Sequence, residues 1–291
     1  MKSIRFLIAA AAAALALAPA GTAAVQHVAA IAARPAPLPP FKSDRISVVV
    51  QGSGPDVILI PGLNSSRDIW RGTVAAVPGY RYHLVQVNGF AGHAPGANSD
   101  GPVVEPVARE IARYIDHQRL QRPSLVGHSM GGTLAMMVAA RQPRGVSKVM
   151  VVDMLPRPTG LFGGGLALLG GIADQLASSV EGRRLLGSIV GGFRSDDPRT
   201  MSDPDVVARA THDLSRTDLT PELPKIAAPM TVLFATPGTA SREHALTVQD
   251  YRLGYVGAKT AKLRPVPESG HMIMFDQPAR FRAEVKAFLA S

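Results

Sequence analysis

The sequence predicts an α/β protein in which helices cover both faces of a mostly parallel sheet. Short apolar, β-branched segments alternate with segments of helical spacing, the pattern of parallel strands joined by crossover helices. Hydrophobic residues make up 46% of the 291 residues and charged residues 18%, the composition of a globular chain with a large core. A glycine-rich turn at residues 127–131 joins one apolar segment to a helical one.

Seven apolar segments are predicted to be strands: residues 46–50, 57–60, 82–87, 124–127, 146–152, 230–235 and 261–266. A glycine-rich turn at residues 51–55 joins the first two segments. Helical spacing is clearest over residues 103–120, where apolar residues recur at i, i+3 and i+4. Shorter helices, the first of them capped by Ser65 or Ser66, are predicted over residues 67–71, 133–141, 243–255 and 279–289.

The alternation of strands and helices stops between residues 155 and 226. Residues 160–192 are apolar and rich in glycine, and residues 203–214 form a predicted helix that begins at Ser202 or Asp203. Both ends of this stretch attach to the carboxyl edge of the predicted sheet. We therefore predict a helical cap at residues 155–226, inserted into a core made of residues 45–154 and 227–291.

The amino terminus has the three-part layout of a secretory signal peptide. Lys2 and Arg5 precede an apolar run over residues 6–18, and small residues follow as far as Ala24. The run is shorter than the ~20 residues of a membrane-spanning helix, which favours cleavage and export over a stable membrane span. We predict a signal peptide at residues 1–24, an Ala/Pro-rich linker at residues 25–44, and a periplasmic or secreted location.

Composition and motifs argue against several classes of partner. The chain has no cysteine, so neither a disulfide framework nor a thiolate metal site is expected. Its net charge of +9 comes from scattered basic residues without a dense basic run, so no binding of nucleic acid is expected. The sequence lacks a phosphate-binding loop and a dinucleotide fingerprint, and we predict no cofactor and no metal. It makes no prediction of the oligomeric state.

The chemistry is predicted to centre on Ser129, in the pattern Gly127-His-Ser-Met-Gly131 between a strand and a helix. The two glycines remove Cβ atoms that would clash in a sharp turn, so the serine can adopt a strained backbone with its hydroxyl clear of the sheet. N–H groups at the start of the helix can stabilise an anion beside that hydroxyl. A serine that only caps a helix gives the same pattern, so a nucleophile also requires a base and an acid.

His271 is the best candidate for the base among the eight histidines. It follows Gly270 in the loop after the last predicted strand, which ends at the same edge of the sheet as the serine turn. His93 lies in another loop at that edge and is a weaker candidate, for contact with a substrate.

The order of Pro61-Gly-Leu63, Gly127-His-Ser-Met-Gly131 and Gly270-His271 on alternating strands and helices resembles the α/β-hydrolase fold superfamily. The likeness covers nearly all of residues 45–290, with residues 155–226 at the position where this family inserts its helical cap. The resemblance implies Ser129 as nucleophile and His271 as general base.

The resemblance also implies where negative charge would be stabilised. The oxyanion hole would consist of the backbone N–H groups of Leu63 and Met130. The family more often has His-Gly where this chain has Pro61-Gly62, but the donor is a backbone group, so the difference has little consequence.

The acid departs from the usual pattern of the family. Members usually carry it in the loop after the next-to-last strand, but residues 235–241 contain no carboxylate. Some members instead place it at the end of the strand that follows the nucleophile helix. Asp153 stands there, 24 residues after Ser129, and is predicted to be the acid. Glu243, at the start of the next helix, is the alternative.

Serine at the turn, where dehalogenases and epoxide hydrolases of this fold carry aspartate, implies acyl transfer to water through an acyl-enzyme. We therefore predict an exported serine hydrolase, by default a carboxylic-ester hydrolase, acting on a small ester-like molecule with an apolar group. The same machinery would serve a lipase, a thioesterase, a peptidase, a carbon–carbon bond hydrolase or a cofactor-free haloperoxidase. A non-catalytic binding protein of this fold is the alternative from a different class, because the usual acid is missing.

Overall fold

The computed structural model describes residues 39–158 and 201–291. The predicted signal peptide and residues 25–38 of the predicted linker lie outside this part of the chain, as do residues 159–200 of the predicted cap. Among the described residues, no helix is both long enough and apolar enough to cross a membrane.

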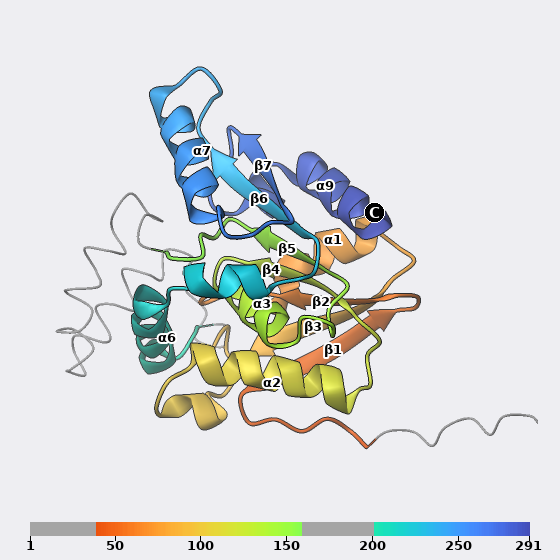
Figure 1. Cartoon of the computed structure of the whole chain (residues 1–291). Coiled ribbons are helices and arrows are strands. Elements are labelled where there is room, and N and C mark those ends of the chain that lie inside the picture. Colours follow the sequence, from red (N-terminus) through yellow and green to blue (C-terminus); the bar gives the residue numbers. More distant parts are fainter. Residues whose placement is uncertain (1–38, 159–200) are drawn as a thin grey trace, which may run out of the picture. The chain divides into compact units, whose positions relative to one another are not determined.

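A seven-stranded sheet forms the centre of the fold (Figure 1), in the order β1-β3-β2-β4-β5-β6-β7. Its strands are β1 (Ile46–Gly52), β2 (Asp56–Ile60), β3 (Arg81–Val87), β4 (Ser124–His128), β5 (Lys148–Val152), β6 (Met230–Thr236) and β7 (Ala261–Pro267). The pair β1–β3 is antiparallel, and every other neighbouring pair is parallel. The seven predicted strands and the mostly parallel sheet are confirmed.

The first two strands are neighbours in sequence but not in the sheet, because β3 lies between them. β1 pairs with β3 along its whole length, from Ile46 opposite Val87 onwards. In the turn after β1, Gly54 has a φ of +121°, and a Cβ there would lie 2.2 Å from the carbonyl oxygen of Gly79. Glycine thus allows the chain to leave β1 closely packed against the segment that leads into β3.

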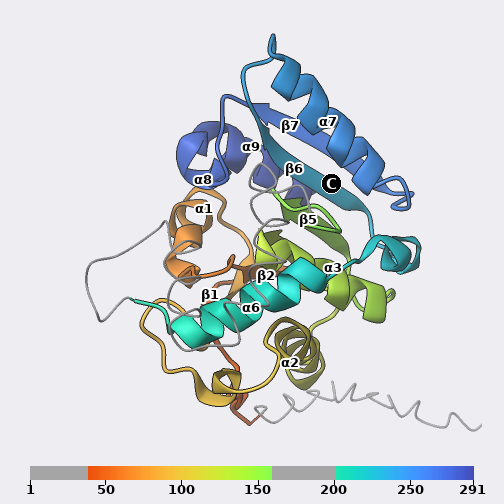
Figure 2. The same ribbon diagram turned by 90° about the vertical axis from the view of Figure 1, so that its left-hand side faces the viewer.

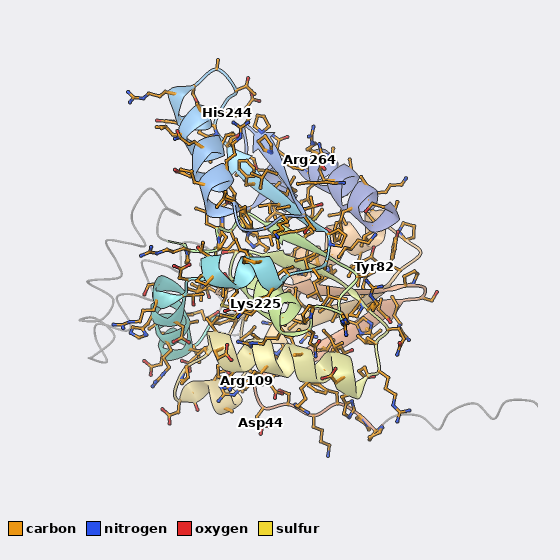
Figure 3. All side chains as sticks on the ribbon, viewed as in Figure 1. Asp44, Tyr82, Arg109, Lys225, His244 and Arg264 are labelled. Atoms are coloured by element: carbon orange, nitrogen blue, oxygen red, sulfur yellow. The ribbon has the colours of Figure 1, made fainter. Side chains whose placement is uncertain are left out.

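Alternating side chains of the parallel strands fill two separate cores, one on each face of the sheet. In β2, Ile58 and Ile60 belong to one core, whereas Val57 and Leu59 belong to the other. The first core contains side chains of α2 (Val104–His117) and α3 (Met130–Arg141), and the second contains those of α1 (Arg71–Ala76) and α9 (Pro278–Ala290). Figure 2 shows these helices on the two sides of the sheet, and Figure 3 shows side chains filling the space between.

The other described elements are the helices α6 (Pro204–Arg216), α7 (Arg242–Gly254) and α8 (Ile273–Asp276), and the 3₁₀ turns η1 (Arg67–Trp70), η2 (Gly96–Ser99) and η3 (Thr220–Lys225). The Asp203 carboxylate caps α6 by accepting from the backbone N–H groups of Asp205 and Val206. Ser66 caps η1 in a similar way. α6 and η3 fall within the range predicted for the cap, but the cap as a whole stays a prediction.

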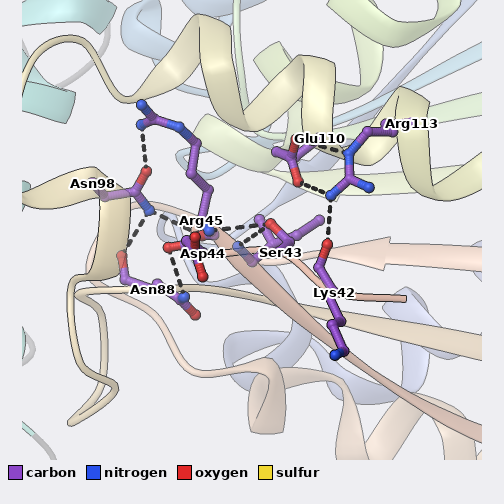
Figure 4. A network of polar contacts seen from close by, with 9 residues as sticks. Lys42, Ser43, Asp44, Arg45, Asn88, Asn98, Glu110 and Arg113 are labelled. Atoms are coloured by element: carbon purple, nitrogen blue, oxygen red, sulfur yellow. Dashed lines mark hydrogen bonds and ion pairs between the residues drawn. The ribbon is translucent and has the colours of Figure 1, made fainter. Parts of the chain in front are cut away.

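The last residues of the predicted linker are attached to the folded domain. Phe41 packs edge to face against Tyr114 of α2, with ring centroids 5.0 Å apart. Figure 4 shows polar contacts beside it, in which Arg113 donates to the carbonyl oxygen of Lys42 at 2.6 Å. The Asn88 side chain donates to the carbonyl oxygen of Asp44 at 3.0 Å. These contacts lead the chain directly into β1.

Candidate active site

Ser129 stands alone between the end of β4 at His128 and the start of α3 at Met130. Its backbone has φ 52° and ψ −123°, a conformation that serine rarely adopts. The Ser129 N–H donates to the carbonyl oxygen of Val152 on β5 at 2.8 Å, and the Ser129 carbonyl accepts from the N–H of Gly132 at 2.7 Å. These bonds hold the strained residue at the carboxyl edge of the sheet.

Two close approaches explain why glycine flanks the turn. A Cβ at Gly127 would lie 2.0 Å from the carbonyl oxygen of Gly131, and a Cβ at Gly131 would lie 2.2 Å from that of Ile60 on β2. Real Cβ atoms essentially never approach other atoms so closely. The predicted reason for the two glycines is therefore confirmed.

Asp153 stands beside Ser129 at the end of the neighbouring strand. β4 pairs with β5 so that His128 lies opposite Val152, and the next residues of the two strands occupy equivalent positions. Asp153 also has a φ of 52°, and its N–H donates to the carbonyl oxygen of Leu233 on β6 at 2.7 Å. The hydrogen bonding of the sheet thus extends one residue beyond each strand and fixes both residues at one edge.

The buried Asp153 carboxylate receives hydrogen bonds on both oxygens. Oδ2 accepts from His271 Nδ1 at 2.7 Å. Oδ1 accepts from the backbone N–H of Ala235 at 2.9 Å and from the hydroxyl of Tyr251 at 3.1 Å. Since an ionised carboxylate only accepts hydrogen bonds, three donors offset the cost of burying its charge.

His271 lies in the loop between β7 and α8. Because the Asp153 carboxylate accepts from Nδ1, the neutral ring carries its proton on Nδ1, and Nε2 is the nitrogen that can accept a proton. The preceding residue is also fixed, since the Gly270 N–H donates to Asp276 Oδ2 at 2.9 Å. With its side chain 21% exposed, His271 combines a fixed tautomer with access from solvent.

The loop after β2 lies against the serine turn. A Cβ at Gly62 would lie 3.1 Å from the Cβ of Ser129, so Leu63 directly follows a point of close contact with the turn. Met130, the other residue of the predicted oxyanion hole, is the first residue of α3, where backbone N–H groups lack partners within the helix. Both backbone segments are therefore close to Ser129.

His128, the residue before Ser129, makes a contact that the sequence did not predict. Its Nε2 donates to the backbone carbonyl of His271 at 2.9 Å, and the centroids of the two rings are 4.6 Å apart. Burial lowers the pKa of His128 to about 3, and the neighbouring His271 adds to this effect. His128 therefore holds the loop that carries His271 without bringing a charge to it.

Tyr251 of α7 is the second residue that the sequence did not assign to the site. Its hydroxyl donates to Asp153 Oδ1, and burial raises the pKa of Tyr251 well above its usual value. Tyr251 and Tyr255, the residue directly after α7, are spaced four residues apart, and both are buried. The spacing does not reveal which partner the hydroxyls contact.

Among the described residues, Glu243 and His93 make no hydrogen bond with the Asp153 carboxylate or the His271 ring. Glu243 is exposed in the first turn of α7, whereas His271 is paired with Asp153. His93 is exposed in the loop after β3. Within residues 39–158 and 201–291, no group of three or more His, Cys, Asp or Glu side chains could hold a metal ion.

A model of the alpha/beta hydrolase family matches residues 57–284 of this chain. That range begins in β2, ends in α9 and includes Ser129, Asp153 and His271. Together with the sheet order and the serine turn, this match identifies the class of protein. The chain belongs to the α/β-hydrolase family.

Two curated proteins with similar sequences have names that describe them as esterases. A pimeloyl-[acyl-carrier protein] methyl ester esterase from Vibrio atlanticus is 26% identical over 212 residues, which cover 66% of this chain and 80% of the relative. A putative esterase/lipase from Haemophilus influenzae is 32% identical over 109 residues, 38% of this chain. The second match spans only 37% of that relative's own length.

Solved structures share the fold at low sequence identity. A thermophilic esterase from Thermogutta terrifontis superposes with a TM-score of 0.65 at 20% identity, covering 84% of this chain and 93% of that chain. MGS-M2, an alpha/beta hydrolase enzyme from a deep-sea metagenome library of the Medee basin, gives a TM-score of 0.66 at 14% identity, covering 88% and 98%. These likenesses concern the fold.

Proposed function

We propose that this protein is a serine hydrolase that cleaves carboxylic esters through an acyl-enzyme. The observation that carries the proposal is the 2.7 Å hydrogen bond between His271 Nδ1 and Asp153 Oδ2, at the edge of the sheet where Ser129 stands on the adjacent strand. A histidine oriented by a carboxylate is the group that a serine hydroxyl needs to become a nucleophile.

In the proposed acylation step, Ser129 Oγ attacks the carbonyl carbon of the ester while His271 Nε2 takes the hydroxyl proton. A bond forms between Oγ and carbon, and the carbonyl electron pair moves onto oxygen. Asp153 stabilises the imidazolium that results. When the tetrahedral species collapses, the bond from carbon to the alcohol oxygen breaks, and His271 gives its proton to the leaving alcohol.

Deacylation follows the same course with water as the nucleophile, which releases the acid and restores the Ser129 hydroxyl. In both steps the oxyanion is proposed to accept hydrogen bonds from the backbone N–H groups of Leu63 and Met130. The positive end of the α3 dipole, at Met130, supports negative charge at the same place.

The substrate is proposed to be a small ester with an apolar acyl or alkyl group. The esterase names of the relatives from Vibrio atlanticus and Haemophilus influenzae support an ester. The many apolar residues of the sequence predicted to form the cap support an apolar group. We also propose export to the periplasm or the medium, which the amino-terminal residue of the recovered protein would test.

Initial rates on p-nitrophenyl esters of increasing acyl length test the proposed activity. Ser129→Ala and Asp153→Asn are expected to lower kcat by about 10³-fold or more, because each removes a member of the proposed triad. Glu243→Gln is the matched control, since it neutralises an exposed carboxylate on α7, and it should keep the parent rate. Loss of activity in Glu243→Gln together with full activity in Asp153→Asn would contradict the assignment of the acid.

If the parent protein hydrolyses no ester, a second assay distinguishes a hydrolase of another bond from a non-catalytic binding protein. A fluorophosphonate, which captures activated serines covalently, should label the parent and not Ser129→Ala. Labelling without ester turnover would direct the search to thioesters, amides or carbon–carbon bonds on the same machinery. Absence of labelling would overturn the catalytic proposal and favour a binding protein of this fold.

A further inference from the structure

We propose that Tyr251 is a positioning residue for the acid, and that its hydroxyl sets both the orientation and the charge distribution of the Asp153 carboxylate. The proposal rests on the proposed function, in which Asp153 is the acid of the triad. Tyr251 is 98 residues from Asp153 along the chain, and its hydroxyl lies 3.1 Å from Oδ1, the oxygen that His271 does not use. It acts on the base through the carboxylate.

The ring of Tyr251 is held firmly enough to aim this hydroxyl. It stacks on Phe234 of β6 with ring centroids 4.0 Å apart and planes at 13°, and its centroid lies 6.3 Å from that of Tyr255, with planes at 9°. Tyr251 is 3% exposed. Burial raises its pKa well above the usual value, with the Asp153 charge adding to this, so the hydroxyl keeps its proton and donates.

The three donors to the carboxylate have different roles. The His271 ring is the group being oriented, and the Ala235 N–H belongs to the backbone of β6. The Tyr251 hydroxyl is the remaining donor, from a different element of the fold. With Oδ1 held from two directions, the carboxylate is prevented from rotating, and Oδ2 stays aimed at His271 Nδ1.

The same hydrogen bond affects the charge that the imidazolium experiences. A donor on Oδ1 draws negative charge away from Oδ2, so removing it should strengthen the attraction of the carboxylate for a protonated His271. Among the described residues, the titratable groups near the pair include His128 of β4, Tyr255 directly after α7, and Asp276 of α8, which accepts from the N–H of Gly270 next to His271. Since His128 is neutral above about pH 3 and Tyr255 stays protonated, neither adds a charge in the working range.

Tyr255, the residue directly after α7, provides a matched control. It belongs to the same aromatic stack and is equally buried, but its hydroxyl donates to the backbone carbonyl of Met154 at 2.6 Å. Tyr251→Phe and Tyr255→Phe each remove one buried hydroxyl and leave one acceptor with a donor fewer. A purely structural role predicts the same result for both variants.

The experiment compares kcat, KM and the pH profile of kcat/KM on the p-nitrophenyl ester that the parent hydrolyses best. Tyr251→Phe should lower kcat about tenfold at unchanged KM, the loss expected when a buried charged group loses a hydrogen bond. The acid limb of its profile should move about half a pH unit upward, because the imidazolium is stabilised more. Tyr255→Phe should keep kcat within about twofold of the parent and leave the profile unmoved.

The outcomes separate this proposal from the proposed function. Equal values of kcat and equal profiles for the two variants, in a parent that hydrolyses esters, would overturn the role of Tyr251. If the parent hydrolyses no ester, proton NMR of the whole chain decides instead, through the downfield resonance of the His271 Nδ1 proton. A shift of that resonance in Tyr251→Phe but not in Tyr255→Phe supports the positioning role, and the same resonance in both variants overturns it.

Discussion

Two helices, α3 and α7, support the two ends of the proposed triad in different ways. In α3, which follows Ser129, every residue from Met130 to Ala140 is buried. In α7, which carries Tyr251 to the Asp153 carboxylate, that tyrosine is the one buried residue of the helix. α3 thus fixes the serine through backbone packed on backbone, whereas α7 reaches the carboxylate with a single side chain.

This difference predicts which positions of each helix tolerate substitution. At the start of α3 an added Cβ has no room, because at Gly131 it would lie 2.2 Å from the carbonyl oxygen of Ile60 on β2. Along α7, large apolar side chains such as Leu246 and Leu253 are exposed, and the sequence can vary at little cost. We expect sensitivity spread along α3 and concentrated at Tyr251 in α7.

The largest effect is expected at the start of α3. Gly131→Ala would place a Cβ 2.2 Å from the carbonyl oxygen of Ile60 and 2.7 Å from that of Pro61, both backbone atoms that cannot turn aside. We expect a loss of about 3 kcal/mol or more in the free energy of unfolding, measured with urea.

Gly72→Ala is the control for this substitution, because a Cβ at Gly72 in α1 meets nothing within 4 Å. It should stabilise the protein by up to about 1 kcal/mol, since alanine is the better helix former. Equal stability of the two variants would contradict the close packing of α3 on β2.

The next largest effect is expected in the pH dependence of stability, and it comes from His128, the residue before Ser129. Its folded pKa of about 3 lies below the ordinary value of 6.5, so between these pH values the unfolded chain binds more protons than the folded one. The free energy of unfolding should therefore fall as the pH is lowered, by roughly 2 to 3 kcal/mol from this residue between pH 6.5 and 4.

His128→Phe should remove that part of the acid sensitivity, which urea unfolding of both proteins at pH 4 to 7 would measure. The pKa of His83 is also lowered, by its burial, but His83 is present in both proteins and its contribution cancels. Parallel pH dependences for parent and variant would show that His128 is not buried in the neutral form.

The smallest effect is expected on the outer side of α7. Leu253 is 64% exposed, and Leu253→Ala should change the free energy of unfolding by less than about 0.5 kcal/mol and leave kcat unchanged. Leu134→Ala, the same substitution at a fully buried position of α3, should cost about 2 to 4 kcal/mol. Similar losses in the two variants would mean that the outer side of α7 is covered in solution.

The strands and the serine turn could be predicted from the sequence because these features depend on local patterns. Short apolar segments, one of them rich in β-branched residues, predicted all seven strands, and the glycines around Ser129 indicated the sharp turn. Chain order placed Asp153 and His271 at the carboxyl edge, where the structure joins them by a hydrogen bond. The helix α8 was missed because four residues are too few to show a periodicity.

Other features depend on contacts between distant parts of the chain. The insertion of β3 between β1 and β2 follows from pairing in three dimensions, which no local pattern records. The contact of His128 with the His271 carbonyl spans 143 residues, and that of Tyr251 with Asp153 spans 98. From the sequence alone, a histidine next to the turn and a tyrosine on a helix could each contact many residues. Only the order of the strands in the sheet brings His128 to His271 and Tyr251 to Asp153.

Because Asp153 directly follows β5, one part of the sequence can change during evolution without separating Ser129 from Asp153. Ser129 and Asp153 both come from the strand–helix–strand unit β4–α3–β5, and the long connection from residue 154 to 229 begins only after Asp153. That connection can be lengthened, shortened or exchanged while the proposed nucleophile and the proposed acid remain within one contiguous stretch of sequence. An acid placed after β6 would lie beyond the connection. Here the pair can be inherited as a unit, independently of changes in the connection.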